Sequence, residues 1–219
     1  MRNRRYGSLT GAAAAVALLA GCQSGSAPAL SLDGLTKTVD AIPGEGQSSC
    51  PLAYDIAKAA KAAGADGASA PGSVKEPGAA IATGEGGKRA VPDTPLAQNP
   101  GALVSCVFHI GQEEVVVHTA ATRHPQAVAP LAPIVAHLAG SSTQDLIAYV
   151  NRMAKAEIGE PVATGSGNVV AVRLKLDGEG DAVMVVGAGE SGRSTMGRER
   201  ITALAGSLAD QVAAAPYRR

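Results

Sequence analysis

Apolar and polar residues alternate over residues 102–110 and 113–121, with the two-residue period of a half-buried β-strand. Gly111 and Gln112 separate the two runs, and glycine at the first central position favours a type II′ turn. The pattern therefore predicts a β-hairpin in which Ile110 faces Glu113. Its more apolar face, which we expect to be the core face, carries Val104, Cys106, Phe108, Ile110, Val115 and Val117. The opposite face carries Ser105, Val107, His109, Glu114, Val116 and His118.

A second pair of alternating runs, 168–176 and 181–187, predicts another hairpin around an acidic, Gly-rich turn. Apolar residues at helical spacing predict four helices, over 51–63, 131–139, 143–157 and 196–214. The clearest helix start is Ser142, which forms a capping box with Asp145. Residues 32–42 fit either a strand or one helical turn.

The predicted order is helix, hairpin, helix, and then the same three elements again. This order suggests two similar halves, over about 50–140 and 141–215, although the residues themselves do not repeat. Two hairpins combined with amphipathic helices indicate an α+β fold. We expect an antiparallel sheet built from the two hairpins, with the helices packed on one face.

Residues 1–21 have the form of an export signal. Three arginines precede a short apolar run at 11–20, which is too short to span a bilayer stably. The end of this run and the two residues after it, Leu19-Ala20-Gly21-Cys22, resemble the bacterial lipobox. At a lipobox the chain is cut before the cysteine and the thiol is joined to a lipid. The alternative is an ordinary cleavable signal with a chance cysteine. Lipidation at Cys22 would place the protein on the extracytoplasmic face of the cell membrane.

Three regions follow from this interpretation. After the signal at 1–21, we expect the lipidated Cys22 and a flexible tether over 22–45, and then a single α+β domain over 46–216. Within the domain, residues 65–101 contain five Pro and seven Gly among 37 residues. So many helix and strand breakers predict a long surface loop.

Composition and charge narrow the function. The 219 residues carry 19 Lys and Arg against 19 Asp and Glu, and removing the signal takes away three arginines, which leaves a net charge of −3. This balance excludes nucleic acid as a partner, because binding phosphates requires a basic face. It also gives no attraction to anionic lipid head groups, so membrane contact is expected through the lipid alone. With 44 Ala, one Phe and no Trp, we expect a thin aliphatic core.

Cys50 and Cys106 remain once Cys22 carries the lipid. Outside the cytoplasm, an even remainder is typical of a disulfide. A metal site and a catalytic thiol are the alternatives. Neither is favoured, because the sequence has no CxxC and neither cysteine lies in a segment rich in His and Asp.

Candidate catalytic residues do not gather in the sequence. There is no G-x-S-x-G nucleophile elbow, so a hydrolase is the least favoured class. Gly187–Gly192 match G-x-G-x-x-G, but the 27 residues that follow predict one helix and no second parallel strand for a dinucleotide. His109 opposite Glu114 indicates a surface pair, and His118 on the same face is too distant to share a metal with His109. We expect no catalytic residue, no metal and no cofactor.

A small basic cluster lies near the start of the final predicted helix. It consists of Arg193, Arg198 and Arg200. Basic residues at a helix N-terminus oppose the helix dipole, so they are compatible with an anionic contact. A solvated face is the simpler interpretation.

The lipobox, the small-residue tether, Cys50 at a helix start and Cys106 in the strand segment Ser105-Cys106-Val107-Phe108 together resemble small exported lipoproteins of actinobacteria of unknown function. Those proteins often carry Cys-x-Trp in the strand, where this chain has Phe108. The resemblance covers about 50–120. It implies a disulfide joining helix and sheet, and a non-enzymatic role in the cell envelope.

We therefore expect a membrane-anchored extracytoplasmic lipoprotein that acts as a non-enzymatic binding or accessory module, of an interaction or sensor type. Its partners would be the membrane, through the lipid on Cys22, and an envelope protein. The alternative is a carrier of a small apolar ligand in a cavity between sheet and helices, which Ala-rich helices could leave open.

Overall fold

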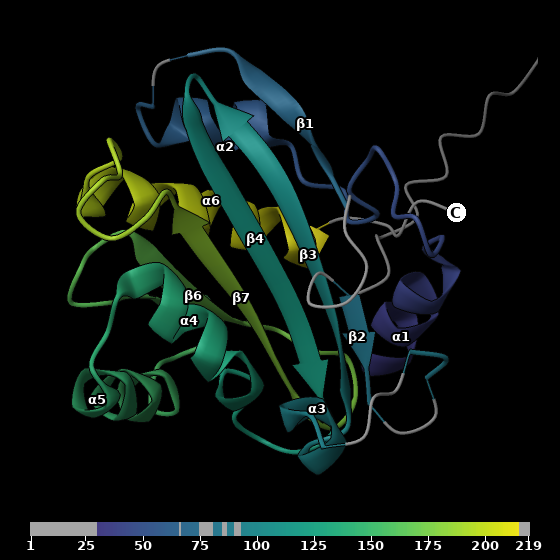
Figure 1. Cartoon of the computed structure of the whole chain (residues 1–219). Coiled ribbons are helices and arrows are strands. Elements are labelled where there is room, and N and C mark those ends of the chain that lie inside the picture. The colour runs from purple at the N-terminus through teal and green to yellow at the C-terminus, as the bar shows by residue number, and fades with distance from the viewer. Residues whose placement is uncertain (1–29, 66, 75–80, 85–86, 90–92, 215–219) are drawn as a thin grey trace, which may run out of the picture.

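Helices cover both faces of one antiparallel sheet in this protein (Figure 1). The structure, a computed structural model, describes residues 30–65, 67–74, 81–84, 87–89 and 93–214. The helices are α1 (Leu32–Ala41), α2 (Ile56–Ala62), α3 (Pro95–Gln98), the 3₁₀ turn η1 (Ala129–Leu131), α4 (Ala132–Ala139), α5 (Thr143–Met153) and α6 (Arg198–Ala214). The strands are β1 (Ser69–Ser73), β2 (Ile81–Thr83), β3 (Gly101–Ile110), β4 (Glu113–Thr122), β5 (Pro161–Ala163), β6 (Val169–Leu174) and β7 (Asp181–Ala188). The expected α+β class is confirmed.

The seven described strands pair antiparallel in the order β1-β3-β4-β7-β6-β5, and the short β2 pairs with the opposite end of β3 from β1. Both predicted hairpins are confirmed, as β3–β4 and β6–β7. Ile110 pairs with Glu113 as expected. Gly111 has a φ of 62° whereas the φ of Gln112 is not positive, as a type II′ turn requires.

The expectation that helices pack on one face alone is wrong. One face packs against α1, α2 and α6, and it carries the core side chains expected from the β3–β4 hairpin. The other face packs against α3, η1, α4 and α5 and has its own buried cluster around Leu131 and Tyr149. The sheet is apolar on both faces at its centre, where all eight residues of β7 are buried. Such a strand requires a helical layer on each side.

The two halves share their strand pattern but not their helices. Each half contains three consecutive partners in the sheet, and the two sets meet where β4 pairs with β7. Because β4 and β7 pair antiparallel where the halves meet, a two-fold rotation that related the halves would have its axis normal to the sheet. Such a rotation would place equivalent helices on the same face. However, α2 and α5, which open the two halves, lie on opposite faces. The expected similarity is therefore one of strand order only.

The tether expected over 22–45 is wrong in its second half. Residues Leu32–Ala41 form α1, whose first turn is capped by the Ser31 hydroxyl, which accepts a hydrogen bond from the Gly34 amide at 3.1 Å. Leu35 and Val39 follow at helical spacing and are fully buried against the sheet. The folded region therefore includes residues from Leu30 onward.

The loop expected over 65–101 contains regular structure in its described parts. β1 and β2 both lie within it and pair with β3, and α3 follows them. The glycines and prolines of this segment interrupt the strands without preventing them. β1 itself is irregular, because its register against β3 shifts between Ala70 and Ser73.

Two predicted helices are shorter than expected. The helix expected over 51–63 begins at Ile56, because the Asp55 carboxylate caps it by accepting a hydrogen bond from the Lys58 amide at 2.9 Å. The helix expected over 143–157 begins at its predicted cap, Ser142, but ends at Met153. Among the described helices, none is long and apolar enough to cross a membrane.

Candidate functional site: a groove beside the disulfide

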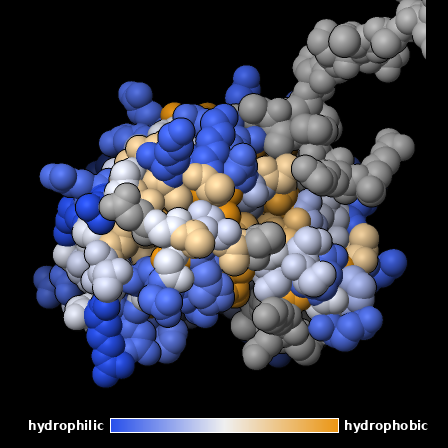
Figure 2. Space-filling model, turned by 90° about the horizontal axis from the view of Figure 1, so that it is seen from above, coloured by the Kyte–Doolittle hydropathy of each residue, from blue (hydrophilic) through white to orange (hydrophobic). Residues whose placement is uncertain are grey.

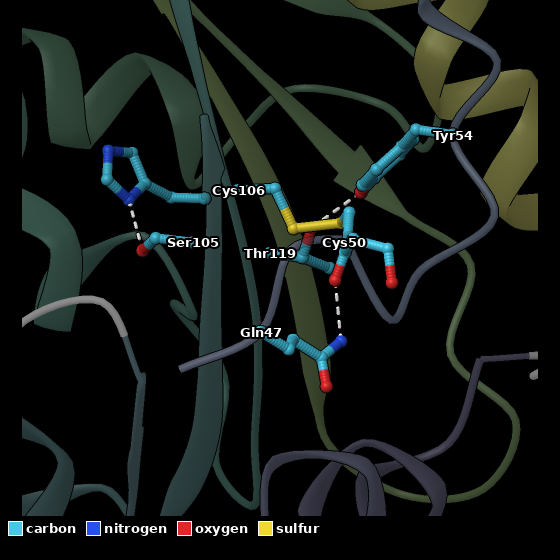
Figure 3. Close-up of a disulfide and its surroundings, with 8 residues drawn as sticks. Gln47, Cys50, Tyr54, Ser105, Cys106 and Thr119 are labelled. Carbon is cyan, nitrogen blue, oxygen red and sulfur yellow. Dashed lines mark hydrogen bonds between the residues drawn. A yellow bond between two sulfur atoms is a disulfide. The ribbon is translucent and has the colours of Figure 1, made fainter. Parts of the chain in front are cut away.

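Cys50 and Cys106 form a disulfide with their Cα atoms 5.6 Å apart, which confirms the expected pairing. Cys106 is fully buried on β3, whereas Cys50 is half-buried in the loop before α2. The bond joins residues 56 positions apart and fastens this loop to the sheet (Figure 3).

The same loop makes two further contacts with the sheet. The Cys50 amide donates to the Gly72 carbonyl of β1 at 2.8 Å. Tyr54 reaches across the sheet to β4, where its hydroxyl and that of Thr119 share a 2.5 Å hydrogen bond (Figure 3). The Tyr54 ring also packs nearly perpendicular to the Phe108 ring, with the ring centroids 6.1 Å apart. The loop is therefore held at several points along its length.

Helix α6 holds the end of this loop. The Gln211 side chain on α6 accepts from the Asp55 amide at 2.6 Å and donates to the Asp55 carbonyl at 3.1 Å. The Gln211 side-chain amide thus bonds both backbone polar groups of Asp55, as a neighbouring strand would. The two hydrogen bonds connect the start of α2 to α6. Packing between α2 and α6 continues the contact on the core side.

These contacts leave a groove of about 470 Å³ between the loop and β1, which we call the disulfide groove. It is lined by Ser49, Cys50, Leu52, Ala53, Tyr54, Asp55, Ile56, Ala57, Ser69, Gly72 and Phe108. Figure 2 looks onto the end of the molecule where α2 and β1 lie, and it shows apolar residues in a band across this end, with hydrophilic residues on both sides. The volume lies within the range of small-molecule sites, roughly 300–1,000 Å³.

Gly72 lets β1 approach the groove closely. A Cβ atom at this position would lie 2.3 Å from the Phe108 ring, so any larger residue would displace one or the other. Phe108 is 1 % exposed. The Phe108 ring is therefore buried directly against Gly72 in the wall of the groove.

The groove combines aliphatic and aromatic side chains with a few polar groups. Its polar side chains are the hydroxyls of Ser49, Tyr54 and Ser69 and the carboxylate of Asp55. No histidine, lysine, arginine or free thiol is among its lining residues.

Ser105 and His118 form a hydrogen-bonded pair away from this groove, on the opposite face of the sheet. The Ser105 hydroxyl lies 2.6 Å from His118 Nδ1, and His118 Nε2 is buried without a partner in the described part of the chain. His118 lies on the face expected to be opposite the core, and it is buried because the second helical layer covers this face. Burial lowers the pKa of His118 to about 4.

This pair does not complete a hydrolase site. A triad requires an acid on the second histidine nitrogen, and that nitrogen is the one left without a partner in the described residues. Another acid on this face, Asp181, lies opposite Thr122, four residues along β4 from His118, and its carboxylate binds Arg173 and the amides of Gln126 and Ala127.

Gly189, in the middle of the G-x-G-x-x-G match, lies beside a carboxylate. A Cβ atom there would lie 2.4 Å from Glu113 Oε1. Burial opposes ionisation of Glu113, but hydrogen bonds from the Thr195 amide and hydroxyl outweigh it and lower its pKa. An ionised carboxylate at this turn would repel a phosphate, so the glycine serves the packing of Glu113.

The other candidate residues from the sequence, two on the first hairpin and three arginines near α6, are not among the residues that line the groove. His109 and Glu114 form the predicted cross-strand surface pair, at 4.0 Å. Arg193 pairs with Glu190, and Arg198 donates to the Gly165 carbonyl. Over the described ranges, no group of His, Cys, Asp and Glu could hold a metal ion. Cys22 lies outside the described residues.

The sequence pointed to the disulfide but not to the groove beside it. The spacing of apolar residues places Tyr54 and Asp55 within a predicted helix over 51–63, and Gln211 is one polar residue among several on α6. One signal was present: Tyr54 is one of only four Tyr in a chain with one Phe and no Trp. A rare aromatic residue four positions after a cysteine was a reason to expect a specific contact.

Comparison of the chain with protein-family models, with curated proteins and with solved structures gave no match.

Proposed function

We propose that this chain is a lipid-anchored, extracytoplasmic binding module of the cell envelope, without a catalytic role, and that the disulfide groove is its binding site. The groove carries this proposal, because a pocket of about 470 Å³ beside two aromatic rings is held open by a disulfide and by contacts to three other elements. Preorganised apolar pockets with few polar groups are typical of ligand sites.

The position of the groove agrees with anchoring at Cys22. The Leu30 carbonyl accepts a hydrogen bond from the Asp177 amide, at the β6–β7 turn. The groove lies at the other end of the sheet, where Ser69 pairs with Ile110 beside the β3–β4 turn. Cys22 precedes Leu30 by eight residues, which can span at most about 29 Å. A lipid on Cys22 would therefore attach the domain to the membrane from the end of the sheet opposite the groove.

Anchoring is tested by labelling. Cells that express the full chain are fed an alkyne-bearing fatty acid, and the purified protein is examined for the label. We expect wild-type protein and a Ser24→Ala control to carry the label, and Cys22→Ser to carry none. Label retained by Cys22→Ser, or absent from the wild type, would show that Cys22 is not the anchor.

Binding is tested with N-phenyl-1-naphthylamine, an uncharged apolar probe whose fluorescence rises on burial. The exported chain 23–219, which contains every described residue, is titrated with it. Ala57→Leu places a larger side chain in the groove, and we expect the dissociation constant to rise roughly tenfold or more. Ala62→Leu, at an exposed position on the same helix outside the groove, is the matched control. Equal binding by both variants, or no binding by the wild type, contradicts the proposal.

The carrier alternative is favoured by one observation, the apolar lining of the groove. A carrier would hold its ligand through purification, whereas a sensor-type module would release it. Native mass spectrometry of the exported chain separates the two. A retained adduct of several hundred daltons favours the carrier, and a bare protein mass favours the binding module.

A further inference from the structure

The disulfide groove has one charged lining side chain, and it is acidic. Asp55 lies at the rim, exposed to solvent. Its Oδ1 atom accepts the capping hydrogen bond from the Lys58 amide, and its Oδ2 atom has no partner among the described residues. Lys58 is exposed on α2, but its side chain is not among those lining the groove. One carboxylate oxygen is therefore available to a ligand.

Two aromatic residues line the same groove as this carboxylate. The ring of Tyr54, the residue before Asp55, packs nearly perpendicular to the buried Phe108 ring. The face of an aromatic ring attracts a cation, most strongly where water is partly excluded. An acid and two rings together favour a positive group and disfavour a negative one.

Four aliphatic side chains also line the groove. Leu52, Ala53, Ile56 and Ala57 come from the loop and the first turn of α2. Burial of an aliphatic or aromatic body against such side chains is favourable. An anionic head group would find no basic lining side chain to pair with.

We infer that the disulfide groove binds a small molecule that joins an apolar body to a cationic nitrogen, with the nitrogen at Asp55 and the body against the more exposed lining side chains, Tyr54 and Ala57. This inference rests on the proposed function, because it names the class of ligand for the same groove. The groove lies at the end of the sheet opposite Leu30, and the ligand that we infer is a dissolved molecule.

The test compares two probes with the same ten-carbon chain and opposite charge. Decyltrimethylammonium and decanoate are titrated calorimetrically into the exported chain 23–219 at low ionic strength, both below their micellar concentrations. We expect decyltrimethylammonium to bind roughly fivefold more tightly, with the difference shrinking at high salt. Asp55→Asn removes the charge but keeps the helix cap, since Asn caps as well as Asp. This variant should bring the two affinities within about twofold of each other.

The outcomes separate this inference from the proposed function. Equal binding of both probes, preferred binding of decanoate, or a cation preference that survives in Asp55→Asn would overturn the ligand class. In those cases the groove remains a binding site if Ala57→Leu weakens binding of the uncharged probe. Failure of all three probes to bind overturns both proposals.

Discussion

At the level of single residues, His118 lacks the solvent that an imidazolium requires. It is 7 % exposed, its one described partner is the uncharged Ser105 hydroxyl, and no acid faces it from β3 or from Val185 on β7. Burial therefore lowers its pKa to about 4, from an ordinary value of 6.5. Between these two values the unfolded chain binds a proton at His118 that the folded protein does not. Folding stability must then fall as the pH falls through this window.

We predict that His118→Asn weakens this acid sensitivity. The His118 contribution amounts to roughly 3 kcal/mol between pH 6.5 and pH 4, and Asn can keep a hydrogen bond to Ser105 without titrating. Urea unfolding at several pH values measures the effect, with the exposed His137→Asn as control. The control should follow the wild type, and the same pH dependence in all three proteins would show that His118 is not the titrating group.

Between elements, the loop before α2 depends on long-range contacts. The apolar spacing of 51–63 predicts that this loop is the start of a helix. The disulfide and the Cys50–Gly72 hydrogen bond instead hold residues 50–55 against β1 as a bent loop, so the helix begins only at Ile56. The sequence separation of 56 residues gives the disulfide a stabilising effect of about 4 kcal/mol in the chain-entropy model.

We predict that replacing both Cys50 and Cys106 by Ala lowers the free energy of unfolding by about 4 kcal/mol. Because the loop forms one wall of the groove, binding of N-phenyl-1-naphthylamine should weaken as well. Urea unfolding and probe titration measure the two effects, each with and without dithiothreitol. The wild type should respond to the reductant and the double variant should not. Unchanged stability of the double variant would contradict a structural role for the bond.

Across the whole molecule, the first and last described helices, α1 and α6, pack on the same face of the sheet. The N-terminal helix α1 covers β2 and β3, and the C-terminal helix α6 packs on α2, β6 and β7 of the same face. This face is therefore built from the first and last described segments of the chain. Its core is incomplete unless both are present.

We predict that a chain beginning at residue 46, the boundary expected from composition, is strongly destabilised. It would lose Leu35 and Val39, two fully buried side chains, at a cost of about 3 to 6 kcal/mol. A chain beginning at Leu30 should unfold at the same urea concentration as the chain 23–219. Equal stability of the chains beginning at 30 and 46 would show that α1 is dispensable.

The sequence predicts the elements that depend on residues close together in the chain. The two hairpins and their register follow from alternation and from Gly111 in the turn, and α4 and α5 begin close to their expected starts. It was less informative for β1 and β2, since five residues and three residues carry too little periodicity to be recognised among glycines and prolines. Of the candidate site, the Cys50–Cys106 pairing was predictable, but the roles of Asp55 and Gln211 were not.

By itself the sequence determined the α+β class, the hairpin register and the pairing of two cysteines, because each depends on residue spacing or on a count. Only the tertiary structure decided that both sheet faces are covered, that α1 belongs to the core, and that a groove opens beside the disulfide. The physical reason is that these features depend on contacts between distant segments. Asp55 and Gln211, 156 residues apart, become partners only when α2 and α6 lie on the same face of the sheet.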